Sequence, residues 1–301
     1  MKIGIFGSTG FVGKSFINAL ITKPVYLRLF SRHLPRSIPT KTGLAYIDPF
    51  HADLDSVKVA DLHDLDIIVN LAAHSANHPY DILTNCIRYN TTAALRLYQT
   101  ALDAGVKAIV HIGSYFEYGT TSNYGRLDTG SIFSPTASYP LSKALASRGL
   151  QQLASRNQFA SFTDLKLFQV YGKGEQKYRL YPSLLHAARC GDDFTVNTGS
   201  LIRDFINVSL VGEIMATYVT SFIPVTGHHV HHICNEVGLS VEEFCSYWWS
   251  WSAATGKLTV RDMKPREGSI PIMLGSLTPT IETIRNHVFI RSPSLMDPWT
   301  R

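Results

Sequence analysis

The sequence predicts an α/β fold, a doubly wound parallel sheet followed by a smaller C-terminal α+β lobe. Short apolar runs alternate with helical patterns through the first half of the chain, which is typical of a parallel sheet flanked by helices. These runs are apolar throughout, as expected for strands buried on both faces. After Gly172 the loops lengthen and aromatic residues become denser, which indicates a second, smaller unit.

The elements follow one another in a regular order. We predict strands over residues 2–6, 25–30, 44–47, 66–71, 108–112 and 162–168, and helices over residues 11–21, 82–104 and 137–155. Ser240 and Glu243 have capping-box spacing at the start of a helix that ends near Gly256. We therefore predict a dinucleotide-binding domain over residues 1–168 and a substrate lobe over 169–301, with 206–222 returning to the first domain.

Composition narrows the function. The 301 residues include 28 basic and 23 acidic side chains, a net charge of +5, with 45% hydrophobic residues; this balance excludes a disordered chain. Like charges never form a run of five, so nucleic acid is not the implied partner, whereas a mild positive excess suits an anionic small molecule. Because no apolar stretch approaches about 18 residues, we expect no membrane span.

The cysteines indicate a reducing environment. Cys86, Cys190, Cys234 and Cys245 show no close pairing such as C-x-x-C, and the N-terminus does not resemble a signal peptide. We expect four buried thiols and a cytoplasmic location.

Gly7, Gly10 and Gly13 follow the first strand and open the first helix with G-x-x-G-x-x-G spacing. Such glycines let backbone N–H groups approach a pyrophosphate at a helix N-terminus. The pattern predicts a Rossmann-type dinucleotide site, with an ordinary strand-to-helix turn as the alternative. The expected contacts are Gly7, Ser8, Thr9, Gly10, Phe11 and Val12.

The end of the second strand favours one cofactor. NAD sites usually place Asp or Glu there, on the ribose 2′-OH. This strand instead ends in Ser31 and Arg32, with Arg36 close behind, and hydroxyl and guanidinium donors suit a 2′-phosphate. The sequence therefore predicts NADP(H) rather than NAD.

Tyr139 and Lys143 form a Y-x-x-x-K motif on a predicted helix, which places them one turn apart on one face. We expect the Lys143 ammonium to lower the pKa of the Tyr139 phenol and prepare it for proton transfer. Ser114 ends the fifth strand, at the sheet edge where open α/β folds bind ligands. We predict that these three residues are catalytic.

The glycine loop, Leu71-Ala72-Ala73, Ser114, Tyr139/Lys143 and Arg203-Asp204-Phe205 occur in one order along the chain. In this the chain resembles the extended short-chain dehydrogenase/reductases, specifically their nucleotide-sugar epimerase/dehydratase branch. The resemblance implies that Ser114 and Tyr139 bind the reacting oxygen, that Lys143 also holds the nicotinamide ribose, and that Leu71, Ala72 and Ala73 line the cofactor. It further implies a homodimer through the helices over 82–104 and 137–155.

The same resemblance implies a nucleotide-diphosphate sugar as substrate. Gln169 replaces the Asn of the family's N-x-Y-G segment, Arg203 belongs to its R-D-F motif, and Arg266 matches a later segment with a second Arg. Arginines clamp phosphates with paired donors. The candidate substrate contacts are Tyr115, Gln169, Arg179, Arg203 and Arg266, and Val170 is expected on the cofactor side.

The resemblance also separates several chemistries. Dehydratases of the family carry an Asp-Glu pair where this chain has Tyr115 and Phe116. Epimerase/reductases that act at positions three and five of a keto sugar carry a Cys near Phe116 and a His near Arg179, and this chain has neither. A 4-epimerase keeps NAD bound, against which Ser31 and Arg32 argue. We therefore predict an NADPH-dependent 4-ketoreductase of nucleotide-diphospho-4-keto-6-deoxyhexoses, in deoxysugar biosynthesis for surface polysaccharides. The alternatives are an NAD-dependent 4-epimerase and a non-catalytic NADPH-binding sensor or scaffold.

Four histidines, His228, His229, His231 and His232, invite a metal interpretation. They lie in a predicted strand, where side chains alternate between faces and cannot all converge. We predict no metal site.

Overall fold

The computed structural model describes residues 1–33, 40–261, 263, 269–296 and 298. Its centre is an eight-stranded sheet in the order β11-β7-β6-β5-β1-β2-β4-β3. Neighbouring strands are parallel except for β3 and β4, which confirms the predicted fold class. The strands are β1 (Lys2–Phe6), β2 (Tyr26–Ser31), β3 (Lys41–Thr42), β4 (Ala45–His51), β5 (Ile67–Asn70), β6 (Ala108–Ser114), β7 (Ser161–Leu167) and β11 (Gly227–Ile233).

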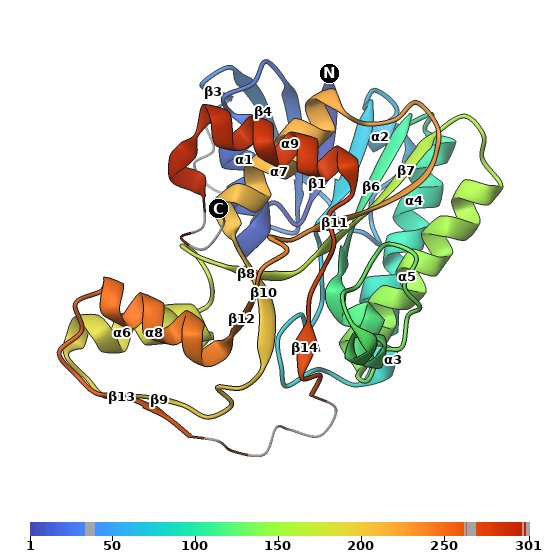
Figure 1. The fold of residues 1–301 in the computed structure, drawn as a ribbon. Helices are drawn as coiled ribbons and strands as arrows, with labels where there is room; N and C mark the ends of the chain where they lie inside the picture. The colour runs from blue at the N-terminus through green and yellow to red at the C-terminus, as the bar shows by residue number, and fades with distance from the viewer. Residues whose placement is uncertain (34–39, 262, 264–268, 297, 299–301) are drawn as a thin grey trace.

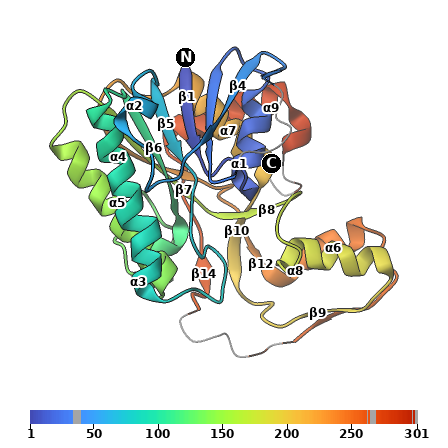
Figure 2. The same ribbon diagram turned by 180° about the vertical axis from the view of Figure 1, so that it is seen from behind.

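Helices cover both faces of this sheet (Figures 1 and 2). One face packs against α1 (Phe11–Leu20), α7 (Val208–Ser221) and α9 (Pro279–Arg291). The other packs against α2 (Val59–Leu62), α4 (Ala93–Asp103) and α5 (Ser138–Ser155). Phe16 and Leu20, four residues apart on α1, are fully buried. Each such side chain stabilises the fold by about 1.5 to 3 kcal/mol.

The face under α4 and α5 also buries polar groups. Asn70, His111 and Asp164 lie side by side on β5, β6 and β7, and all three are almost completely buried. Asn70 Nδ2 donates to the hydroxyl of Tyr98 on α4 at 3.0 Å, and that hydroxyl lies 2.6 Å from His111 Nδ1. This row of polar contacts crosses the sheet beneath its carboxyl edge.

The helix predicted over 82–104 is continuous but not uniform. It consists of α3 (Leu83–Cys86), the π-helical segment η1 (Ile87–Thr92) and α4. Within the π-helical turn, Asn90 Nδ2 donates to the carbonyl of His74 at 3.0 Å and to Ser142 Oγ at 2.9 Å. Asn90 Oδ1 accepts the N–H of His74 at 2.7 Å. The turn therefore joins the loop after β5 to helix α5.

A smaller lobe stands to one side of the sheet, where Figure 1 shows α6 (Leu180–Cys190) and α8 (Val241–Trp251) side by side. Its core joins these helices to Tyr171 and Phe205. The predicted capping box is confirmed, because Ser240 Oγ accepts the N–H of Glu243 while Glu243 accepts the N–H of Ser240. The remaining elements are β8 (Gln169–Tyr171), β9 (Phe194–Val196), β10 (Ile202–Asn207), β12 (Gly238–Ser240), β13 (Leu258–Val260), β14 (Ile272–Met273), η2 (Tyr115–Tyr124) and η3 (Pro293–Leu295).

The chain returns to the sheet after the smaller lobe has begun. Ser15 Oγ on α1 donates to the carbonyl of Val208 at 2.7 Å, and a Cβ on Gly212 would lie 2.6 Å from Ser15 Oγ, so α7 packs closely on α1. Strand β11 and helix α9 also belong to the sheet and its apolar cover. The domain boundary at residue 168 remains a prediction.

All four cysteines are free thiols, but they differ in exposure. Cys86, Cys234 and Cys245 are buried, whereas Cys190 is exposed, so the prediction of four buried thiols is wrong for Cys190. This residue ends α6 and lies outside the apolar side of that helix, which buries Leu184 and Ala188. Within the described residues, no helix combines the length and apolar character needed to span a membrane.

Candidate functional site

A cavity of about 890 Å³ runs along the carboxyl ends of the parallel strands. It lies where the chain reverses direction across the sheet, between the loops after β1 and β5, the position at which open α/β sheets bind ligands. Most predicted site residues line it, namely Gly7, Thr9, Gly10, Phe11, Val12, Ser31, Arg32, Leu71, Ala72, Ala73, Ser114, Tyr115, Tyr139, Lys143, Gln169, Val170 and Arg179.

The glycine loop has no room for side chains. Gly7 has φ of +81°, and a Cβ there would lie 2.5 Å from the backbone N of Ala72. A Cβ on Gly13 would lie 2.3 Å from the carbonyl oxygen of Gly7. Helix α1 starts at this loop without a side-chain cap or an acidic residue in its first turn, which leaves its N–H groups for an anion. The loop therefore fits the pyrophosphate of a dinucleotide.

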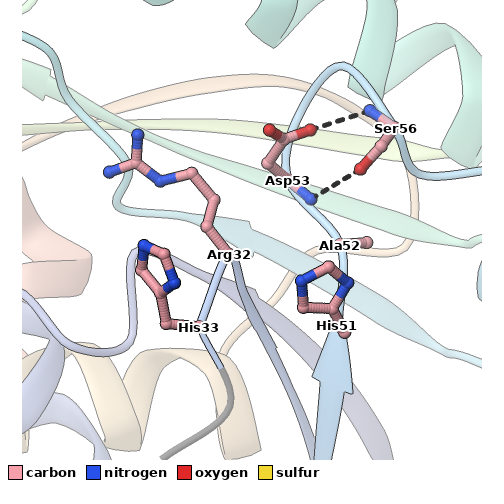
Figure 3. Close-up of a pocket in the computed structure, with 6 residues that line it drawn as sticks. All are labelled: Arg32, His33, His51, Ala52, Asp53 and Ser56. Atoms are coloured by element: carbon pink, nitrogen blue, oxygen red, sulfur yellow. Dashed lines mark hydrogen bonds between the residues drawn. The ribbon is translucent and has the colours of Figure 1, made fainter.

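A side pocket of about 270 Å³ lies at the ends of β2 and β4, lined by Arg32, His33, His51, Ala52, Asp53 and Ser56 (Figure 3). Asp53 was not predicted as a site residue. Its Oδ1 accepts the N–H groups of Asp55 and Ser56 at 3.0 and 2.8 Å. Partial burial opposes its ionisation, but these hydrogen bonds and the charge of Arg32 hold the pKa of Asp53 below its ordinary value.

Register explains how the sequence analysis missed Asp53. Ser31 pairs with His51 in adjacent parallel strands, so residues just beyond both strands reach the same edge of the sheet. The third predicted strand ended at residue 47, whereas β4 continues to His51. A longer strand would have placed Asp53 beside Arg32.

The three catalytic candidates lie together in the structure, at the positions that the sequence predicts. Ser114 ends β6, while Tyr139 and Lys143 lie one turn apart on α5, and all three line the cavity. The hydroxyl of Ser114 hydrogen-bonds to the Tyr139 phenol. Burial lowers the pKa of Lys143 to about 8, although the charges of Glu117 and Asp164 oppose this.

The expected lowering of the Tyr139 pKa is not seen. Burial raises that pKa above its ordinary value, the charge of Glu117 raises it further, and only the hydrogen bond from Ser114 opposes the change. The effect of desolvation on a fully buried phenol thus exceeds any attraction of the phenolate to Lys143. Tyr139 is protonated at neutral pH, the form in which it donates a proton.

A group that we call the buried ionic cluster lies beneath these residues. It comprises Glu117 on η2, Ser147 on α5, and Asp164 and Lys166 on β7, each buried. Lys166 forms ion pairs with both Glu117 and Asp164. None of the four was predicted as a site residue.

The substrate candidates divide into two groups. The Tyr115 hydroxyl donates to Gln169 Oε1 at 2.6 Å, and Arg179 Nε pairs with Glu175 Oε1 at 3.2 Å; these residues line the cavity. Arg203 instead is buried, donates to the carbonyls of Ile202 and Pro271 at 2.8 and 3.2 Å, and is not among the lining residues. It borders the cavity only through a hydrogen bond with Tyr115.

Three further candidates are placed differently or not described. Ser8 is buried and does not line the cavity, because the close-packed glycine loop turns it inward. Arg36 falls within 34–39 and Arg266 within 264–268, both outside the described residues.

The histidines of β11 point to opposite faces. His231 Nδ1 lies 2.7 Å from Thr278 Oγ1, and His232 Nε2 lies 2.7 Å from the Tyr118 hydroxyl. Burial lowers the pKa of each to about 4. Among the residues that the structure describes, no three His, Cys, Asp or Glu side chains cluster as metal ligands would.

A parallel sheet with a glycine loop at its switch point and a cavity along its carboxyl edge defines an α/β protein of the Rossmann class. More specifically, the chain belongs to the NAD dependent epimerase/dehydratase family, whose sequence model matches residues 3–230. No curated protein matches the chain significantly.

Several solved structures share the fold. MoeE5 in complex with UDP-glucuronic acid and NAD superposes with a TM-score of 0.81 at 22% identity, over 95% of this chain and 93% of MoeE5. TunA, an NAD dependent NDP-hexosamine 5,6-dehydratase involved in tunicamycin biosynthesis, gives 0.77 at 20% identity, over 95% and 92%. UDP-N-acetylglucosamine 4-epimerase from Methanobrevibacter ruminantium gives 0.77 at 19% identity, over 94% and 91%.

Proposed function

We propose that the protein reduces the 4-keto group of a nucleotide-diphospho-4-keto-6-deoxyhexose with NADPH. One observation carries the proposal: a single cavity extends from Arg32 at the end of β2 to the Ser114–Tyr139–Lys143 group. Such a cavity suits a phosphorylated dinucleotide at one end and carbonyl chemistry at the other. Family membership supports a nucleotide sugar as the substrate class.

The glycine loop, residues 71–73 and Lys143 would hold the cofactor, and Ser31 and Arg32 would bind its 2′-phosphate. When bound, the cofactor would supply a hydride for the carbonyl carbon. Ser114 and Tyr139 hold the carbonyl oxygen, and Tyr139 transfers its phenolic proton to that oxygen as negative charge develops there. The Lys143 ammonium stabilises the resulting tyrosinate.

The substrate end carries fitting groups. Arg179 offers a guanidinium to the diphosphate, since arginines bind phosphate with paired donors. Gln169 and Tyr115 lie beside it in the cavity, where amide and phenol groups suit the sugar or the diphosphate.

A 4-epimerase that keeps NAD is the second candidate, and Asp53 favours it. This carboxylate lies in the same side pocket as Arg32 (Figure 3), and a carboxylate there suits a ribose hydroxyl better than a phosphate. Structural neighbours in complex with NAD, such as MoeE5, support the same candidate.

Thermal-shift measurements with NADPH, NADP, NADH and NAD separate the two candidates, after the purified protein has been assayed for bound cofactor. We expect the protein to purify without cofactor. We expect NADPH and NADP to stabilise it more than NADH and NAD, since a ligand that binds more tightly raises the melting temperature more. NADPH consumption with CDP-, dTDP-, GDP- and UDP-linked 4-keto sugars then identifies the nucleotide. Co-purified NAD or a preference for NADH sinks the reductase and moves the epimerase to first place.

Replacement of Tyr139 by Phe tests the catalytic assignment. We expect reduction to fall at least about 100-fold because the proton donor is lost, with NADPH binding nearly unchanged. Tyr46→Phe is the matched control, since this tyrosine lies in β4 and is 48% exposed. Near wild-type turnover in Tyr139→Phe contradicts the assignment.

We also propose a cytoplasmic homodimer. The adjacent helices α3 and α5 expose Leu83 and Leu145, and burial of such side chains favours association. Light scattering of the wild type and of Leu145→Asp tests this, and a monomeric wild type contradicts it.

A further inference from the structure

Glu117 connects three elements around the catalytic group. Its side chain is completely buried, and its Oε1 accepts the N–H of Ser114 at 2.7 Å. Its Oε2 accepts the hydroxyl of Ser147 at 2.8 Å and the ammonium of Lys166. One carboxylate therefore ties the end of β6 to α5 and to β7.

The hydrogen bonds favour a charged form of the buried ionic cluster. Each neighbour of Glu117 donates to its carboxyl group, which stabilises the carboxylate, whereas burial opposes ionisation and raises the pKa of Glu117. Lys166 contacts Glu117, Asp164 Oδ2 at 2.7 Å and Ser147 Oγ at 2.6 Å, which occupies its three N–H groups. This one ammonium balances only one of the two carboxylates.

Lys143 is a second buried cation on which the charges of both carboxylates act. It is 2% exposed and precedes Ser147 by one helical turn. No carboxylate of the described residues forms a direct ion pair with it, so its stabilisation comes from nearby charge. The charged and titratable groups around it are Glu117 on η2, Asp164 and Lys166 on β7, and His111 on β6, and Tyr139 lies one turn before it on α5. Burial keeps His111 neutral.

The packing allows little movement of this arrangement. A Cβ on Gly113 would lie 2.6 Å from Asp164 Oδ1, 2.7 Å from Lys166 Cδ and 2.9 Å from Glu117 Oε1. The charged groups thus press against the backbone one residue before Ser114. Displacement of Glu117 is transmitted directly to the catalytic hydroxyl.

We propose that Glu117 is a positioning residue for Ser114, Tyr139 and Lys143: it fixes the backbone of Ser114 and provides the buried negative charge that balances Lys143. Its effect on turnover rests on the proposed function. Its effect on Lys143 does not, because that charge balance exists in the protein without cofactor.

The first experiment compares pH profiles of turnover for wild type, Glu117→Gln and Glu117→Asp. Gln keeps the acceptor for Ser114 but removes the charge, so Lys143 loses its proton more readily. We expect the alkaline limb of kcat to move down by about one pH unit or more and KM to change less than about threefold. Asp keeps the charge but shortens the reach, so kcat falls while the limb stays in place.

The second experiment needs no turnover. The pKa of Lys143 is about 8 in the fold and 10.5 in the unfolded chain, so the unfolded state binds the extra proton between these values. Lys143 therefore makes stability rise with pH across that window. In Glu117→Gln the folded pKa falls further, and the rise starts at lower pH. Melting temperatures of each protein with and without Lys143→Met isolate this contribution.

The outcomes separate the two proposals. A wild type without reductase activity sinks the proposed function, while the cofactor-free melting curves still decide the role of Glu117. An unchanged Lys143 window in Glu117→Gln overturns the charge role, as does a kcat loss equal at every pH. Should Glu117→Gln not fold, the double variant Glu117→Gln/Lys166→Met removes both charges of one pair. Asp164 then balances Lys143, and a window displaced from that of the wild type contradicts the proposal.

Discussion

The face of the sheet under α1, α7 and α9 is almost entirely apolar, whereas the face under α4 and α5 buries polar and charged side chains. The first holds Ile3, Phe16 and Leu210 in one continuous core. The second places Asp164 and Lys166 on one strand, with Glu117 above them. Burial of charge costs stability unless every group is paired. The apolar face therefore stabilises the fold, whereas the polar face supports the candidate site at the carboxyl edge of the sheet.

The largest effect is expected on the polar face. Lys166→Met removes the ammonium that pairs directly with both Glu117 and Asp164, and loss of one partner from a buried pair costs about 3 to 5 kcal/mol of the free energy of unfolding. Denaturant unfolding measures it. The triple variant that also carries Glu117→Gln and Asp164→Asn should recover most of the loss. If stability is not recovered, the buried ionic cluster contributes net stability, which contradicts our inference that its buried charges cost stability.

On the apolar face, Leu210→Ala should lower the free energy of unfolding by about 2 to 5 kcal/mol because it leaves a cavity. Leu210 is 0% exposed on α7. The affinity for NADPH should stay unchanged, since Leu210 itself does not line the cavity. Phe159→Ala, at a side chain 84% exposed, is the control, with an effect within about 0.5 kcal/mol. A change in cofactor affinity in Leu210→Ala breaks the comparison.

A smaller effect is expected from Tyr98→Phe, in the polar row. Its hydroxyl accepts from Asn70 Nδ2 and so donates to His111 Nδ1, and both groups lose their partner in the variant. Buried groups left unpaired cost about 1 to 3 kcal/mol. Equilibrium unfolding measures the loss, with Tyr46→Phe on the surface as the control. A neutral result shows that this row contributes nothing to stability.

The smallest expected effect is a dependence of stability on pH that comes from one buried histidine on each face of the sheet, His231 and His232. His231 lies against Tyr218 and His232 near Lys166, so these two buried histidines of strand β11 lie on opposite faces of the sheet. The folded pKa of each is about 4 against 6.5 in the unfolded chain. The unfolded state alone gains protons as pH falls from 6.5 to 4, and stability declines across that window.

Melting temperatures between these pH values check this. His231→Gln and His232→Gln should each flatten the decline, whereas His63→Gln, at an exposed position, should not. A decline of equal steepness in all three proteins contradicts the assignment of neutral buried histidines.

Most of the fold could be predicted from local sequence patterns. The apolar strands, the glycine loop and the Ser240–Glu243 capping box depend on neighbours in sequence, and the structure has each of them. The Tyr139–Lys143 pair was accessible for the same reason, because both residues occupy one helix face.

The rest depends on contacts between distant segments. Glu117 joins Ser147, 30 residues away, and Lys166, 49 residues away, and no spacing in the sequence indicates that meeting. The resemblance to the family pointed to the neighbouring positions Tyr115 and Phe116 instead. The rise in the Tyr139 pKa was missed similarly, because it depends on how completely the folded chain removes water from the phenol.

The π-helical turn at Ile87–Thr92 has a consequence for comparing sequences. Such a turn holds one residue more than an α-helical turn, so it behaves as a single-residue insertion accommodated without breaking the helix. Deletion of one residue there would convert the π-helical turn into an ordinary α-helical turn and remove the local backbone geometry that holds Asn90 against His74 and Ser142. In an alignment, a gap belongs inside this turn, and placing it elsewhere shifts every residue of one half-helix onto the wrong partner.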